Sequence, residues 1–137
     1  MNKIKSICLP ALLAAGLSAN AFALPCDGFE IKVKNNLPDN LLVTQIRLNG
    51  AEVQPGGIQQ IEGKSEQAFT INKSAEKGIM SGEFVFHTVS LPSKVVKVKF
   101  DLANEALICN HTDKTPANDY PVDKTRLPNQ VLYTIGK

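Results

Sequence analysis

The sequence contains no tryptophan and few of the side chains that form metal centres. After residue 23 it has two histidines, one methionine and two cysteines. Structural zinc sites use four Cys or His ligands, and copper sites use several His, Cys or Met ligands. Cys109 and His111 form one Cys-x-His pair, but further donors are scarce. The composition therefore predicts no transition-metal cofactor.

An excess of charge of one sign is also missing. All 13 acidic residues follow residue 23, whereas two of the 15 basic residues, Lys3 and Lys5, precede it, so residues 24–137 carry no formal net charge. A neutral domain has no overall field that attracts nucleic acid. No apolar run after residue 23 approaches the ~20 residues of a transmembrane helix. The sequence therefore predicts neither a nucleic-acid partner nor a transmembrane segment.

Residues 1–23 have the pattern of a secretory signal peptide. A basic start precedes a short apolar run, and Ala21-Phe22-Ala23 matches a small-x-small cleavage site. We expect cleavage after Ala23, export to the periplasm or the extracellular space of a bacterium, and one domain over residues 24–137. Lipidation of Cys26 is the alternative, although Pro25 and Ala23 make a poor lipobox.

Cys26 and Cys109 are the two cysteines that remain after cleavage. Because disulfides form in oxidising compartments, we expect these two residues to pair. Such a bond closes most of the domain into one loop, for which chain-entropy arguments give a stabilisation of about 4–5 kcal/mol.

Short alternations of apolar and polar residues predict strands, and Gly, Pro and Asn clusters separate them. Asn49-Gly50 is a strong signal for a two-residue hairpin, whereas residues 72–81 lack alternation and are expected to form a loop. The pattern predicts an all-β antiparallel sandwich of eight or nine short strands, immunoglobulin-like or a related Greek key, with a barrel as the alternative. The expected strands span residues 29–34, 41–48, 51–54, 58–61, 67–71, 83–90, 95–102, 106–110 and 130–135.

The period-two phase of these strands also predicts which residues are buried. Outward phases carry two pairs of lysines, at 32 and 34 and at 97 and 99. If those strands were neighbours, the lysines would form a basic stripe; otherwise they keep strands soluble and block edge-to-edge pairing. The predicted core is Ile31, Val33, Leu42, Ile46, Leu48, Phe69, Ile71, Phe84, Phe86, Val96, Val98, Phe100 and Leu107.

Residues 111–129 form the longest segment without a strand pattern. Long loops in compact domains are usually functional or mobile, and prolines at 116, 121 and 128 limit the freedom of this one. We interpret the segment as a binding loop with Tyr120 as its aromatic anchor. The expected contact residues are Asp119, Tyr120, Asp123, Lys124 and Arg126.

Two other interpretations of this segment stay open. It could be a solvated crossover stiffened by proline. It could also hold calcium through the carboxylates of Asp113, Asp119 and Asp123, although nearby basic residues dilute their charge and the spacing matches no established calcium loop.

Motifs for catalysis are absent. Residues 78–82 place glycines around a serine, but not at the spacing of a nucleophile elbow. We therefore expect a small exported non-catalytic binding protein without a cofactor, such as a host- or envelope-interaction factor, whose partner is a protein, a surface glycan or a lipid headgroup. The alternatives are a calcium-dependent module that binds a ligand or a membrane surface and, third, a small secreted enzyme.

Overall fold

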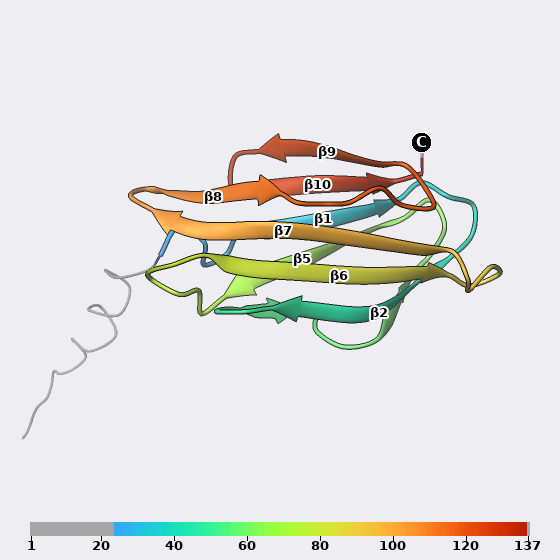
Figure 1. Cartoon of the computed structure of the whole chain (residues 1–137), viewed down its shortest axis with the longest axis horizontal. Coiled ribbons are helices and arrows are strands. Elements are labelled where there is room, and N and C mark those ends of the chain that lie inside the picture. The colour runs from blue at the N-terminus through green and yellow to red at the C-terminus, as the bar shows by residue number, and fades with distance from the viewer. Residues whose placement is uncertain (1–23, 137) are drawn as a thin grey trace, which may run out of the picture.

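The computed structural model describes residues 24–136, which form ten strands in two five-stranded sheets (Figure 1). Sheet A has the strand order β3-β5-β1-β10-β9, and sheet B has the order β4-β2-β6-β7-β8. The strands are β1 (Glu30–Asn35), β2 (Leu41–Leu48), β3 (Glu52–Gln54), β4 (Gln59–Ile61), β5 (Glu66–Asn72), β6 (Met80–Thr88), β7 (Val95–Glu105), β8 (Ile108–Asp113), β9 (Val122–Leu127) and β10 (Gln130–Ile135).

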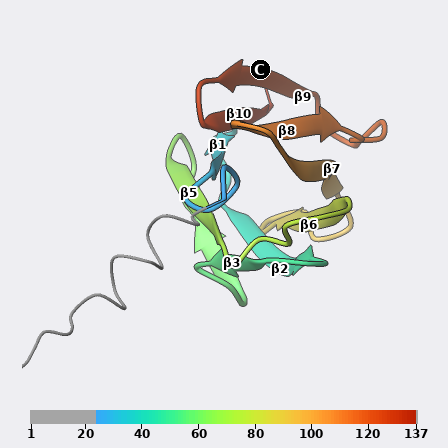
Figure 2. The ribbon, with the colours of Figure 1, turned by 90° about the vertical axis from the view of Figure 1, so that its left-hand side faces the viewer.

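The two sheets face each other, as the view along the strands shows (Figure 2). The prediction of an all-β, mainly antiparallel sandwich is confirmed. No helix in the described part of the chain is long and apolar enough to cross a membrane. The predicted signal peptide and its cleavage site lie outside the described residues.

One pair of neighbouring strands runs parallel. β1 lies between β5 and β10, antiparallel to β5 and parallel to β10, with Glu30 opposite Gln130 and Asn35 opposite Ile135. The first and last strands of the domain therefore form the centre of sheet A.

Aromatic side chains from both sheets fill the space between the layers. The Phe84 ring centroid lies 5.0 Å from that of Phe69 in sheet A and 5.5 Å from that of Phe100 in sheet B. Nine of the residues predicted from period-two alternation are buried in this core. They are Ile31, Val33, Phe69, Ile71, Phe84, Phe86, Val96, Val98 and Phe100.

The predicted burial of Leu42 is wrong. It faces outward between two buried neighbours, and the pairing of β2 with β6 shifts register between Val43 and Gln45. Because this bulge changes which alternate residues face the core, Ile46 and Leu48 point inward after it and pack partly against the core. A single extra residue thus reverses the phase of half a strand.

The predicted burial of Leu107 is also wrong. The expected turn at residues 103–105 is part of β7, and the chain turns at Ala106 and Leu107, because Glu105 pairs with Ile108 across a two-residue turn. Leu107 therefore stands at the tip of the hairpin and is 92% exposed.

Residues 111–129 are not one loop. β8 extends to residue 113 and β9 occupies residues 122–127, so that only 114–121 and the 128–129 turn lie outside strands. β9 pairs with β10 alone, and five of its six residues are exposed. Its inner face holds Val122, Lys124 and Arg126, so a single apolar residue marks that face, and without apolar alternation the strand was missed.

The basic stripe does not form. Lys32 and Lys34 lie on β1 in sheet A, whereas Lys97 and Lys99 lie on β7 in sheet B. The four lysines are thus separated by the core, and one of them, Lys99, lies 3.8 Å from the Glu83 carboxylate.

Candidate binding surfaces

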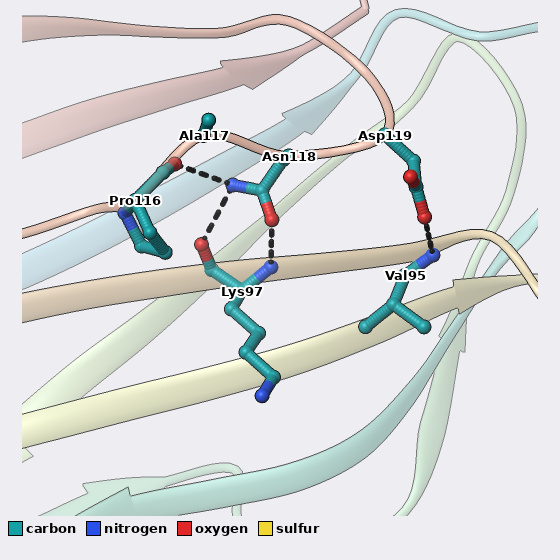
Figure 3. Close-up of a pocket in the computed structure, with 6 residues that line it drawn as sticks. All are labelled: Val95, Lys97, Pro116, Ala117, Asn118 and Asp119. Carbon is teal, nitrogen blue, oxygen red and sulfur yellow. Dashed lines mark hydrogen bonds between the residues drawn. The ribbon is translucent and has the colours of Figure 1, made fainter.

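The segment 114–121 lies along the first half of β7, where β8 provides no partner (Figure 3). The Asn118 side chain accepts a hydrogen bond from the Lys97 N–H at 2.7 Å and donates one to the Lys97 carbonyl at 2.9 Å. Asp119 Oδ2 accepts the N–H of Val95 at 2.8 Å. Two side chains thereby replace part of a missing neighbouring strand.

Thr115 completes this arrangement at the next outward-facing position of β7. Its hydroxyl oxygen accepts the Lys99 N–H at 3.1 Å, and the Lys114 N–H donates to the Lys99 carbonyl at 2.8 Å. The segment therefore covers the open edge of β7 with side chains at every second residue, which prevents pairing with another chain.

The predicted contact residues Asp119 and Tyr120 both have partners within the domain. Asp119 is bonded to β7, and Tyr120 is half-buried and packs against the core. Shallow hollows remain on either side: about 430 Å³ between β7 and residues 116–119, and about 210 Å³ beside Tyr120. Their binding role stays a prediction.

The three carboxylates proposed for calcium are not brought together. Asp113 accepts hydrogen bonds from the Tyr133 hydroxyl at 3.2 Å and from the Thr115 N–H at 3.1 Å. Asp119 faces β7, and Asp123 lies on β9 opposite Thr134. Within residues 24–136, no three acidic, His or Cys side chains group as a metal site requires.

A polar cluster fills the seam where β8 of sheet B meets β9 and β10 of sheet A. The His111 ring lies between those of Phe29 and Phe100, at centroid distances of 6.3 and 6.0 Å, and its Nε2 is 2.9 Å from the Tyr133 hydroxyl. Burial lowers the pKa of His111 to about 4, and the charges of Arg126 and Lys124 act in the same direction. The imidazole is therefore neutral at physiological pH.

Burial and the Asp113 carboxylate both raise the pKa of the Tyr133 hydroxyl. Tyr133 is fully buried and links His111 on one side to Asp113 on the other. The hydrogen bonds among these three side chains join β8 to β10. At neutral pH the imidazole of His111 and the phenol of Tyr133 are both uncharged, and the carboxyl group of Asp113 lies beside the phenol.

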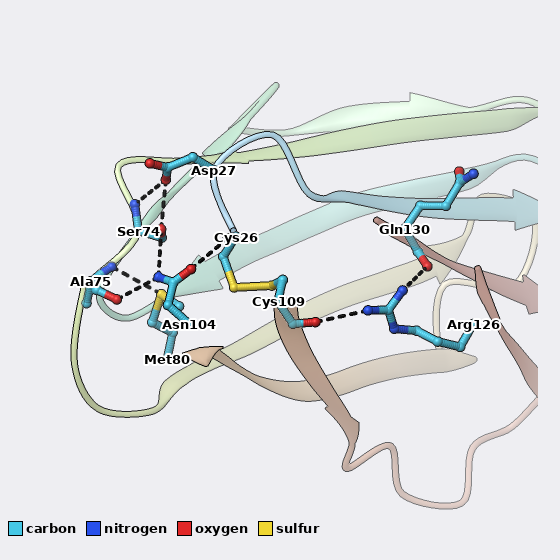
Figure 4. The surroundings of a disulfide bond; sticks show 9 residues. All are labelled: Cys26, Asp27, Ser74, Ala75, Met80, Asn104, Cys109, Arg126 and Gln130. Atoms are coloured by element: carbon cyan, nitrogen blue, oxygen red, sulfur yellow. Dashed lines mark hydrogen bonds between the residues drawn. A yellow bond between two sulfur atoms is a disulfide. The ribbon is translucent and has the colours of Figure 1, made fainter. Parts of the chain in front are cut away.

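Arg126, another predicted contact residue, also bridges the sheets. Its guanidinium lies 4.9 Å from the centroid of the Phe29 ring and donates to the carbonyls of Cys109 and Gln130, each at 2.9 Å. It also donates to the Leu127 carbonyl. The side chain thus ties β9 to β8 and covers one end of the core (Figure 4).

The predicted disulfide is confirmed, and it anchors the same end of the sandwich (Figure 4). The Cys26 N–H donates to Asn104 Oδ1 at 2.7 Å, and Asn104 Nδ2 donates to Ser74 Oγ at 3.0 Å. Ser74 in turn donates to Asp27 through both its N–H and its hydroxyl. The chain before β1, the β5–β6 connection and β7 are thereby joined in one network.

The tip of the β7–β8 hairpin projects from this anchored end. Leu107 is 92% exposed and Ile108 is 59% exposed. Ala106, the first turn residue, has a φ of 50°, where glycine is usual. We call Leu107 and Ile108 the apolar tip. A hollow of about 500 Å³ adjoins it, lined in part by Leu24, Pro25, Arg126 and Pro128.

No protein-family model matches the sequence, and no curated protein matches it significantly.

Sequence patterns did not reveal the apolar tip. Leu107 lies two residues before Cys109, in the same period-two phase, and therefore has the pattern of a core residue. A signal was nevertheless present. The turn expected at residues 103–105 lies directly before the observed one at Ala106 and Leu107, and side chains at turns are usually exposed.

Proposed function

We propose that residues 24–137 form an exported, non-catalytic binding domain that contacts a protein partner through the apolar tip. The main support is the exposure of Leu107 at a turn whose first residue, Ala106, has a positive φ. Glycine at position 106 would adopt this φ without strain, and a polar residue at position 107 would be better hydrated than leucine. A turn that departs from both local preferences is typical of a functional contact.

The base of the hairpin is fixed, which favours recognition. Cys109 follows the tip directly and is bonded to Cys26, while Asn104 lies on the opposite strand of the hairpin and holds the Cys26 N–H. A prearranged apolar side chain loses little conformational freedom when it is buried in a partner.

The charges near the tip favour a protein over an anionic membrane. Asp27 and Arg126 line the larger hollow, whereas Asp101 and Glu105 line a smaller one on the other side of the hairpin. Acidic residues thus outnumber basic ones around the tip, and insertion into anionic lipid requires the reverse.

Export is part of the same proposal. The disulfide is consistent with an oxidising compartment, in which such bonds persist. Cleavage after Ala23 would make Leu24, which lines the hollow next to the tip, the first residue. The mass of the exported protein should therefore match a chain whose first residue is Leu24. A protein that keeps residues 1–23, or carries a lipid on Cys26, would contradict this.

A photo-cross-linking amino acid at position 107 tests the contact in cells that export the protein. We expect a discrete adduct that disappears when Ile108→Asp is added to the same chain, because the second change charges the tip without touching the cross-linker. The same amino acid at position 58 is the control, since Ile58 is 76% exposed but lies in the β3–β4 connection. Equal adducts from both positions, or none from position 107, would overturn the proposal.

A further inference from the structure

β9 offers a long backbone edge. In an antiparallel pair, residues alternately direct their N–H and C=O groups toward the partner strand and away from it. The Gly136 N–H donates to the Pro121 carbonyl at 2.8 Å, which places the odd-numbered residues of β9 in the bonded set. The backbone groups of Val122, Lys124 and Arg126 therefore point away from β10, where no strand lies within the described chain.

The other edges of the two sheets are short, or side chains cover part of them. β3 and β4 have three residues each. The open half of β7 is bonded to side chains of the segment 114–121, and the Cys109 carbonyl on β8 accepts Arg126. β9 has six residues, five of them exposed. It is thus an accessible edge of a length that another strand can use.

The inner face of this edge is basic. Lys124 and Arg126 lie opposite Tyr133 and Val131, both of which point into the core, so their side chains share the inner face of sheet A. Among residues 24–136, Lys124 has no ion-pair partner. A strand added beside β9 would therefore place every second side chain next to these two cations.

A second copy of the chain is a poor occupant. Antiparallel pairing of two β9 strands with matching faces would put Lys124 opposite Lys124 or Arg126, and like charges on directly opposed positions repel. The same two cations would attract carboxylates. Charge complementarity therefore selects an acidic segment from another protein.

We propose that β9 accepts an extended acidic segment of a partner protein as an added strand of sheet A. Backbone hydrogen bonds to residues 122, 124 and 126 hold the segment, and carboxylates at its positions i and i+2 face Lys124 and Arg126. This site is distinct from the apolar tip and does not depend on it.

An eight-residue peptide of alternating Glu and Thr is the probe. Titrated into the isotopically labelled mature domain, it should shift the backbone NMR signals of β9 and slow hydrogen exchange at the N–H groups of Lys124 and Arg126. Binding should weaken with added salt. Lys124→Glu should weaken it at least about tenfold, whereas Lys114→Glu, the same charge change on the neighbouring connection, should have little effect.

Two matched peptides separate strand addition from simple charge attraction. Replacing Glu by Lys should abolish binding, and methylating the peptide amides that would face β9 should do the same. Equal binding of either peptide, shifts confined to other strands, or no binding of the Glu–Thr peptide would overturn the proposal.

Discussion

The Phe100 ring fills the space that a side chain on Gly82 would occupy. The two residues are cross-strand partners in sheet B, and a Cβ at position 82 would lie 2.6 Å from Phe100 Cε2 and closer still to Cζ. Phe100 is buried and contacts both Phe84 and His111. One ring therefore joins the centre of the core to the seam, and it fits there because residue 82 has no side chain.

Gly82→Ala should destabilise the domain although alanine lowers the entropy of the unfolded chain. Overpacking of this kind costs about 1–3 kcal/mol, and Phe100→Ala should cost about 3–5 kcal/mol through the cavity it leaves. Urea unfolding measures both. Once the ring is gone, Gly82→Ala should cost much less. Additive losses in the double variant would show that the two sites do not share this space.

The stability of the domain should depend on the protonation of His111. Its pKa is about 4 in the fold, against an ordinary value of 6.5. Between these values the unfolded chain binds a proton that the folded chain excludes, so the free energy of unfolding falls as the pH is lowered through this window. The slope is up to about 1.4 kcal/mol per pH unit.

Urea unfolding at several pH values measures this slope. His111→Gln removes the titration and keeps a polar side chain beside Tyr133, so it should flatten the curve between pH 6.5 and 4. A variant with the same slope as the parent would assign the pH dependence to other groups.

Loss of the disulfide should be costly. The bond joins residues 83 positions apart, and chain-entropy arguments give about 4–5 kcal/mol for a loop of that length. The double variant Cys26→Ala/Cys109→Ala should therefore unfold at much lower urea concentration. Asn104→Ala, with the disulfide intact, tests the network separately and should cost about 1–3 kcal/mol, because it removes the acceptor of the Cys26 N–H. An unchanged midpoint for the double variant would contradict the anchoring role.

Asn118→Ala should expose the edge of β7. It removes both hydrogen bonds to the Lys97 backbone, which should cost about 1 kcal/mol and speed hydrogen exchange at the Lys97 N–H. Asn110→Ala, an exposed asparagine on β8, is the control and should leave that exchange unchanged. If hydrogen exchange at the Lys97 N–H is the same in both variants, the Asn118 side chain does not protect this N–H from water.

The sequence was informative where a strand has one buried face. Alternation around Phe69 and Phe100 identified inward positions correctly, because each strand there packs on the opposite sheet. It failed at Leu42, where a bulge that no local pattern marks reverses the phase, and at β9, where five of the six residues are exposed. Burial produces alternation, so elements that lack burial cannot be found by it.

The candidate surfaces were hidden for the same reason. Asp119 and Arg126 are polar residues in a proline-rich segment, which is equally typical of a binding loop and of side chains that bond to a backbone edge. Only their partners, the Val95 N–H and the Cys109 carbonyl, distinguish the two roles. Those partners lie in other strands, and their proximity depends on the order of strands in the sheets.

The parallel pairing of β1 with β10 governs the order in which the domain can assemble. Much of sheet B consists of hairpin neighbours, β6 with β7 and β7 with β8, which can pair as soon as they are synthesised. In sheet A, β1 must await a partner from the far end of the chain, since Glu30 pairs with Gln130. Long-range pairings of this kind form late and slowly. A chain emerging in sequence order therefore remains without a completed sheet A until β10 arrives, and until then both long edges of β1 cannot be paired.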